Sequence, residues 1–347
     1  MEELVLQNLL NGDTEAQIQA AAQLGNLNGK QRHNLVERGV MLPLISMLHS
    51  QDFETIEAAL FALLTLAFGS ERNKSWILKS GALPVLINLL QCQSKALIEL
   101  TITAFMIVSS CKENKLSIAS SGAIGQILEI LNGDYANANS NGMHMNKNTI
   151  AISTQARLDS VATLHNLSTY HQIMPSLVSA GVVFSLLQII RTCQKPSQLV
   201  EKSIALLDDI VSSSKSALKE TAATYDAIGA LVETIEEGSS ESKEHAVRIL
   251  LFICQSCREN YRGLILREGV MPGLLQLTVD GTWRAKTMAE ELLLLLRDCS
   301  SYGRRHQQSR NEVIEQIMQE IDAEGEEVAG ATALRLLARL GRIQWNI

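Results

Sequence analysis

Few side chains in this 347-residue sequence have the types and spacings of a catalytic or metal-binding site. Cys254 and Cys257 form a C-x-x-C pair, a spacing found in zinc sites and in redox motifs. A zinc site needs two more ligands, and the sequence contains no second pair. A redox pair would follow a strand at the start of a helix, whereas this pair lies inside a helical pattern. We therefore expect two ordinary helical cysteines, largely buried.

The other polar residues form no catalytic constellation. Asp208 and Asp209 are adjacent, so on a helix they point about 100° apart and do not share one site. His144 stands between two methionines, which suggests copper, but it has no partner ligands. The sequence contains no nucleophile elbow, zinc-protease helix, P-loop or dinucleotide fingerprint. We expect no enzyme activity, no metal and no cofactor.

The composition indicates a helical protein with an aliphatic core. Hydrophobic residues make up 46% of the chain and aromatic residues 4%, so Leu, Ile, Val and Ala must fill the core. Only five prolines interrupt it, which favours helices over a turn-rich β fold. The net charge of -7 argues against a nucleic-acid partner, because nucleic-acid binders usually show a basic face.

Two features of the sequence indicate where in the cell the protein is expected. The N-terminus lacks the basic region and cleavage site of a signal peptide. No apolar run is long enough to span a bilayer. We expect a cytoplasmic or nuclear protein with no membrane insertion.

Apolar segments repeat along the chain. A residue suited to ending a helix precedes such a segment at six places: Gly39, Gly81, Gly122, Gly181, Asp226 and Gly269. The steps between them are 42, 41, 59, 45 and 43 residues, and four of the five fit helical repeats of about 40–47 residues. Each unit predicts a short first helix, a sharp turn at Gly or Asp, a second helix and a longer third helix.

The third helices are expected to lie between neighbouring units. Residues 56–68, for example, are apolar on nearly every helical face. Residues 4–27 are typical of a second and third helix without a first, so the sequence begins inside a unit. Either the chain was cut from a longer one, or this face meets a partner.

This pattern resembles the armadillo repeat. The resemblance lies in segments such as SGALPVLINLL, residues 80–90, and ATLHNLS, residues 162–168. The sequence GTWRAKTMAEELLLLL, residues 281–296, is similar to the GTxRAKxKAxxLL ending of plant U-box proteins. The resemblance covers about residues 4–298. It implies an all-α fold, a right-handed α-solenoid of about six to seven repeats in residues 1–300.

A U-box begins with Cys-Pro and would precede the repeats. The sequence has no Cys-Pro dipeptide and no room for such a domain before residue 4. The resemblance therefore implies a protein-interaction scaffold rather than ubiquitin-ligase activity. Its partner would be a peptide, a helix or a folded domain, with a kinase or a ubiquitination substrate as candidates. The alternative is a substrate-recruiting component of ubiquitination.

Stacked armadillo units wind into a superhelix whose third helices line a concave groove. In peptide-binding armadillo proteins, an Asn on each third helix clamps the partner's backbone. The aligned residues here are Asn26, Thr65, Ile107, Asn166, Asp209 and Phe252. Importin-type carriers place Trp one turn earlier, and we do not expect such a carrier because no Trp holds those places. The residues there are Ala22, Phe61, Thr103, Ala162, Ala205 and Arg248.

Eight of these residues form the predicted partner-binding groove: Asn26, Phe61, Thr65, Ile107, Asn166, Asp209, Arg248 and Phe252. Their mixed character suits an amphipathic helix or a folded partner better than a basic peptide. Asn166 is the strongest candidate, because an Asn in mid-helix has poor propensity and no evident local role. The alternative is that these side chains face solvent or pack against the next unit.

Two segments lie outside the repeat pattern. Residues 132–155 are rich in Asn and lack periodicity, so we expect a long loop that is either functional or disordered. Residues 301–347 are expected to form a linker and a helical tail. Apolar spacing over residues 313–321 predicts a helix that pairs with a second helix across Gly325. This hairpin would cap the last repeat or bind a partner helix.

Overall fold

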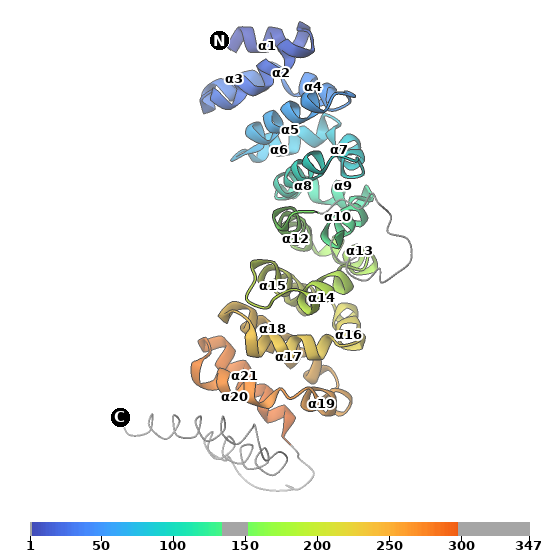
Figure 1. Ribbon diagram of the computed structural model, residues 1–347, viewed down its shortest axis with the longest axis vertical. Coiled ribbons are helices and arrows are strands. Elements are labelled where there is room, and N and C mark those ends of the chain that lie inside the picture. The colour runs from blue at the N-terminus through green and yellow to red at the C-terminus, as the bar shows by residue number, and fades with distance from the viewer. Residues whose placement is uncertain (1, 134–151, 298–347) are drawn as a thin grey trace, which may run out of the picture. The chain divides into compact units, whose positions relative to one another are not determined.

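The computed structural model describes residues 2–133 and 152–297. In these two ranges every regular element is a helix, and no strand occurs. Most of the predicted loop, with His144, and the predicted C-terminal hairpin lie outside the described residues. The chain divides into two compact units, Met1–Ser185 and Leu186–Ile347. Figure 1 shows the helices of both units.

The first unit begins with a half repeat, as predicted. It consists of α1 (Glu2–Asn11), α2 (Thr14–Gln23) and the 3-10 turn η1 (Leu24–Asn26). The second repeat consists of α3 (Gly29–Glu37), α4 (Met41–Met47) and α5 (Phe53–Ala67). The third consists of α6 (Glu71–Lys79), α7 (Ala82–Leu90) and α8 (Lys95–Ser109). The fourth contains η2 (Lys112–Asn114), α9 (Lys115–Ser120), α10 (Ala123–Leu131) and α12 (Thr154–Ser168).

The fifth repeat crosses the boundary between the units. It contains η3 (His171–Ile173), α13 (Met174–Ser179), α14 (Val182–Thr192) and α15 (Gln198–Ser213). The sixth contains α16 (Lys215–Ala223), α17 (Ala227–Glu237) and α18 (Ser240–Ser256). The seventh contains α19 (Arg258–Arg267), α20 (Met271–Asp280) and α21 (Trp283–Leu296). The described chain thus holds six full repeats and one half, which confirms the expected all-α solenoid.

The turn between first and second helices adopts the left-handed conformation that the sequence predicts. Gly81 has a φ of 93° and Gly269 has a φ of 74°. Asp226 has a φ of 61° and is the one non-glycine residue with positive φ in the described ranges. Such a φ brings Cβ close to the backbone, so glycine adopts it freely and Asp tolerates it. After the turn the second helix packs against the third helix of its repeat, as α7 does on α8 and α17 on α18.

Third helices pack side by side within each unit. In the first unit α2, α5, α8 and α12 form one row, and in the second α15, α18 and α21 form another. One register of these helices is apolar and at most 2% exposed: Leu60, Ile102, Val161, Ile204 and Val247. Burying one such side chain contributes about 1.5–3 kcal/mol. Aliphatic side chains shared between repeats therefore hold each row together.

Hydrogen bonds add a second link between successive third helices. A glutamate near the start of one helix accepts a hydrogen bond from the N-cap residue of the next. The pairs are Glu99–Ser153 at 2.8 Å, Glu201–Ser239 at 2.9 Å and Glu244–Thr282 at 2.6 Å. Each carboxylate lies at the positive end of the neighbouring helix dipole, which favours its charge. These contacts fix the register between the helices.

Candidate functional site

The first unit places five predicted partner-binding residues on its row of third helices. Phe61 on α5 is 54% exposed. Thr65 and Ile107 are half-buried, and Asn26 is exposed in η1. The Thr65 hydroxyl donates a hydrogen bond to the Phe61 carbonyl oxygen at 2.8 Å. Of these two side chains, the Phe61 ring is therefore the one that offers more surface to a partner.

Asn166, the fifth of these residues, has a structural role. Its Nδ2 donates to the carbonyl oxygen of Met106 and to Ser109 Oγ, both at 3.0 Å. Both acceptors lie on α8, whereas Asn166 lies on α12. The expectation that Asn166 lacks a local role is therefore wrong. Its amide binds the protein's own backbone and ties two third helices together.

The second unit places the other three residues on α15 and α18. Asp209 is exposed, and Arg248 and Phe252 are half-buried. Arg248 Nε donates to Asp208 Oδ2 at 2.5 Å, and Arg248 Nη2 contacts the same oxygen. The guanidinium is therefore held against α15 on one side while part of it remains at the surface.

Asp208 is the centre of a polar cluster that the sequence reasoning missed. It has no exposed surface, and its Oδ2 lies 2.7 Å from His245 Nδ1. Its Oδ1 has no hydrogen-bond partner in the described residues. A buried carboxylate is costly unless it is paired, so Arg248 and His245 make its burial possible. The register of Asp208 gave one indication of its burial. The residue at the same register in the next repeat is the apolar Leu251, which is 4% exposed.

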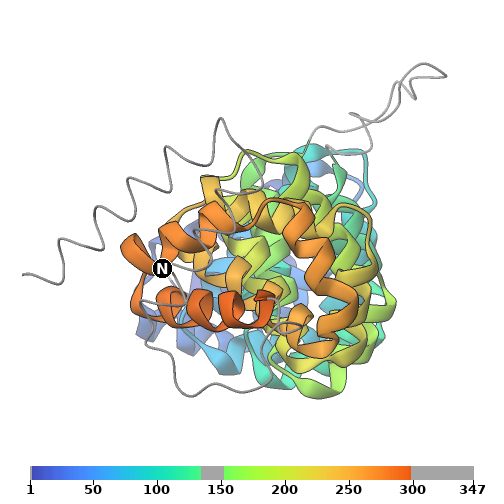
Figure 2. The same ribbon diagram turned by 90° about the horizontal axis from the view of Figure 1, so that it is seen from below.

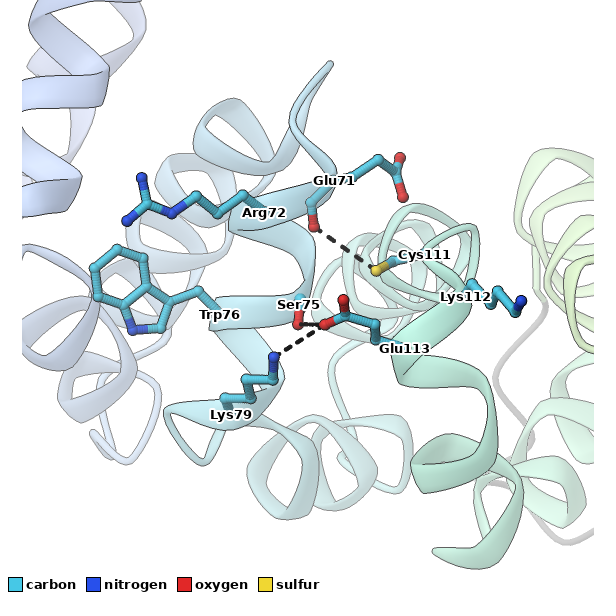
Figure 3. A pocket seen from close by; sticks show the side chains of 8 residues that line it. All are labelled: Glu71, Arg72, Ser75, Trp76, Lys79, Cys111, Lys112 and Glu113. Atoms are coloured by element: carbon cyan, nitrogen blue, oxygen red, sulfur yellow. Dashed lines mark hydrogen bonds and ion pairs between the residues drawn. The ribbon is translucent and has the colours of Figure 1, made fainter.

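A cavity of about 650 Å³ lies on the first-helix side of the first unit, between α6 and η2 (Figure 3). Trp76 lines it, with the Arg72 guanidinium carbon 5.4 Å from the ring centroid. Glu113 accepts hydrogen bonds from Ser75 Oγ at 2.5 Å and Lys79 Nζ at 2.9 Å. The Ser75 hydroxyl and then Lys79 hold the pKa of the Glu113 carboxyl below its usual range. These polar groups pair with one another where two repeats meet. We therefore interpret the cavity as part of the packing between repeats and not as a binding site.

The cysteine pair differs in part from the expectation. Cys254 is buried in α18, and burial raises the pKa of its thiol. Cys257 is half-buried and lies at the break between α18 and α19, not inside one helix. Within residues 2–133 and 152–297, no three His, Cys, Asp or Glu side chains gather to hold a metal. No single helix in these residues is long and apolar enough to cross a membrane. One bent pair of helices, His171–Ser179 and Val182–Thr192, has the length and composition for a span when its two helices are taken together.

Two family models match the chain. The armadillo/β-catenin-like repeat matches residues 70–104, and the plant U-box protein ARM repeat region matches residues 143–305. The chain is an armadillo-repeat protein. The resemblance that the repeats suggested is thereby confirmed, and the left-handed hinges and rows of third helices are those of armadillo units.

Plant U-box proteins are among the relatives of this armadillo-repeat chain. U-box domain-containing protein 45 of Arabidopsis thaliana is 28% identical over 265 residues, which cover 75% of this chain and 31% of that protein. U-box domain-containing protein 6 of the same plant is 31% identical over 172 residues, or 49% of this chain and 19% of that protein. The likeness therefore spans about a third or less of each relative.

Solved structures agree on the fold. An engineered protein has a TM-score of 0.68 and 19% identity, covering 97% of this chain and 77% of its own. A designed armadillo repeat protein has a TM-score of 0.54 and 17% identity, covering 84% of this chain and 98% of its own. At such identities the similarity concerns the armadillo fold alone.

Proposed function

We propose that this armadillo-repeat chain is a non-catalytic scaffold that binds a protein partner along its rows of third helices. The main support is Phe61, whose phenyl ring is 54% exposed on α5. Exposed aromatic side chains on a rigid helical surface are typical centres of protein interfaces. Ile107 on α8 extends this apolar surface, and Phe252 offers a second one on α18.

The residues at the positions where peptide-binding armadillo proteins carry Asn favour a helix or a folded domain over an extended peptide as the partner. An extended peptide would need amide side chains with free donors to clamp its backbone. Of the two asparagines at these positions, Asn166 already donates both Nδ2 hydrogens to α8. Side-chain packing on Phe61 and Ile107 does not have this requirement, so we propose an amphipathic or folded partner.

Paired substitutions test this proposal. Phe61→Asp should weaken capture of a crosslinked partner from cell extract at least tenfold, because it places a charge at the centre of the surface. Leu42→Asp is the matched control, since Leu42 is 64% exposed but lies on the second helix α4. Capture that falls equally with Leu42→Asp would contradict the proposal. So would crosslinks confined to residues 132–155 or 303–347.

A role in ubiquitination is the second candidate, supported by the names of the plant relatives. In this version the chain recruits a substrate, such as a kinase, for a ligase on another chain in the cytoplasm or nucleus. A discharge assay with a ubiquitin-charged E2 separates the possibilities. The scaffold proposal expects no discharge by the chain alone, and unaided discharge would overturn it. Ubiquitination of the captured partner only when the chain and a ligase are both present would support recruitment.

A further inference from the structure

Helix α5 exposes two aromatic rings on one stripe. It packs between α2 and α8 in the first unit, whose helices run from blue to green in Figure 1 and Figure 2. Phe61 is 54% exposed and Phe68 is 82% exposed, and residues seven apart lie on the same face of a helix. Phe68 ends the helix with a φ of -60°, and its N–H donates a hydrogen bond to the Leu64 carbonyl oxygen at 3.0 Å. Its side chain therefore continues the helical stripe, about 10 Å beyond Phe61 along the helix axis.

The aromatic pair is specific to α5. In α8, α12, α15 and α18 the residues aligned with Phe68 are Ser110, Thr169, Ser212 and Gln255. Those aligned with Phe61 are Thr103, Ala162, Ala205 and Arg248. These helices pack into the same rows without aromatic side chains there, so repeat packing does not require Phe61 and Phe68. Two aromatic rings on one exposed stripe are typical of a surface that binds a partner.

The side chains next to the rings extend the apolar surface. Met106 and Ile107 are half-buried on α8, at the register of Leu64 and Thr65 on α5. The Thr65 hydroxyl lies between the two rings in sequence and already donates to the Phe61 carbonyl oxygen. A partner that covers the rings therefore leaves no hydroxyl of Thr65 without its hydrogen bond.

The other half of the stripe is acidic. Glu54 and Glu57 are exposed, about two turns and one turn before Phe61. Among the residues that the structure describes, neither carboxylate takes part in an ion pair or a side-chain hydrogen bond. The helix dipole favours Glu54 in the first turn, but this effect fades within one turn and does not account for Glu57. Neither α2 nor α5 contains a Lys or Arg, so the two helices supply no counter-charge.

We propose that the stripe of α5 binds an amphipathic helix of a partner protein, with Lys or Arg at one end of that helix's apolar stripe. Its apolar side chains would pack on Phe61 and Phe68, and its basic side chains would face Glu54 and Glu57. The inference rests on the proposed function, because it names the class of partner for the same row of third helices.

The spacing of the two rings favours a helix over a strand. Two helical residues seven apart are also separated by about 10 Å and share one face, so a helix that lies along α5 places one anchor on each ring. An extended strand covers the same distance in about three residues. Because side chains of a strand alternate between its two faces, residues three apart point to opposite sides and only one can reach a ring.

The two glutamates determine the charge of the partner. Complementary charge across an interface favours the correct partner and disfavours wrong ones. Basic side chains complete Glu54 and Glu57, whereas an acidic helix or a nucleic-acid backbone would place further negative charge against them. The stripe therefore distinguishes among amphipathic helices by the charge beyond their apolar residues.

Selection from a phage-displayed library of helices on the full chain tests the proposal. Each helix has about six turns, with Leu at two positions seven residues apart and Lys or Glu in equal proportion at the stripe positions beyond each Leu. The wild-type chain should enrich Lys over Glu at least tenfold at one end of the stripe. The double variant Glu54→Lys, Glu57→Lys should enrich Glu there instead. Glu129→Lys is the matched control, because Glu129 is exposed on the second helix α10 and its reversal should leave the preference for Lys unchanged.

The affinity of the most enriched helix, measured by fluorescence anisotropy, tests the aromatic half. Phe61→Asp and Phe68→Asp should each weaken binding at least tenfold, because each puts a charge under an apolar anchor. Both side chains are exposed, so circular dichroism should show an unchanged fold. Phe184→Asp is the control, since Phe184 is 49% exposed on the second helix α14 and should leave the affinity unchanged.

Three results would overturn the inference. One is a library from which the wild-type chain enriches no helix, or enriches Lys and Glu equally. A second is enrichment of Glu on the wild-type chain. The third is a selected helix that binds Phe68→Asp as tightly as the wild-type chain. If any of these occurs while Phe61→Asp still abolishes capture from extract, the scaffold proposal stands and only the basic helix is wrong. Capture that falls equally with Leu42→Asp contradicts the scaffold proposal whatever the library selects.

Discussion

Lys115 Nζ donates a hydrogen bond to Thr169 Oγ1 at 2.5 Å, joining the first helix of the fourth repeat to the end of its third helix. A basic residue seven positions before the hinge makes the same kind of contact in other repeats. Its partners are Thr65 O for Arg32, Ser110 Oγ for Lys74 and Leu296 O for Arg262. Positive charge at the carboxyl end of a helix interacts favourably with the helix dipole, so these contacts stabilise the four repeats that have them.

The buried position of Lys115 predicts a pH dependence. Burial lowers the pKa of its ammonium below the value of 10.5 that it has when solvated. Between these values the unfolded chain binds more protons, so the free energy of unfolding rises with pH. The fifth repeat has Met174 at this register, so Lys115→Met is a conservative test. In urea titrations at pH 7 and pH 10, the wild-type chain should gain stability relative to Lys115→Met at the higher pH. An unchanged difference would show that burial does not govern this lysine.

Asp208 should be more important for stability than its neighbour. Asp208→Ala leaves Arg248 and His245 without their shared acceptor, and breaking a buried ion pair costs about 3–5 kcal/mol. Because both partners remain partly exposed, we expect the lower part of this range. Asp209→Asn, on the exposed adjacent residue, should change the free energy of unfolding by no more than about 0.5 kcal/mol. Chemical denaturation followed by circular dichroism measures both, and equal losses would contradict the role assigned to Asp208.

Gly81→Ala should destabilise the chain by about 1–2 kcal/mol, because a φ of 93° strains any residue with a Cβ. Gly263→Ala is the matched control. Gly263 lies inside α19, and an added Cβ there meets no atom within 4 Å. Its substitution should stabilise the chain by about 0.5–1 kcal/mol through helix propensity. Thermal unfolding should therefore move in opposite directions for the two variants, and a common direction would refute the conformational explanation.

Asn166→Ala should lower the free energy of unfolding by about 1–2 kcal/mol, because it removes two hydrogen bonds to α8, one to the Met106 carbonyl and one to Ser109 Oγ. Phe61→Asp should cost less, since Phe61 is 54% exposed. Both variants should be compared by urea denaturation before any binding measurement. If Asn166→Ala unfolds at the same urea concentration as the wild-type chain, its contacts with α8 do not contribute to stability.

Local features of the chain were predictable from the sequence. The six hinge residues were identified because only glycine, and to a lesser degree Asp, accepts a positive φ at a helix end. The helices were identified because apolar residues recur at helical spacing, which gathers them on one face of each helix where they can be buried. The number of repeats and the armadillo resemblance followed from these two patterns.

Only the tertiary structure decided which polar residues meet. Asp208 and His245 are 37 positions apart, and Asn166 lies 60 positions from Met106. Such contacts depend on the register between neighbouring third helices, which is set by side-chain packing and by bonds such as Glu244 to Thr282. Periodicity within one helix contains no information about that register. The sequence by itself therefore determined the repeats and their hinges, and packing between repeats decided which side chains are structural and which remain at the surface.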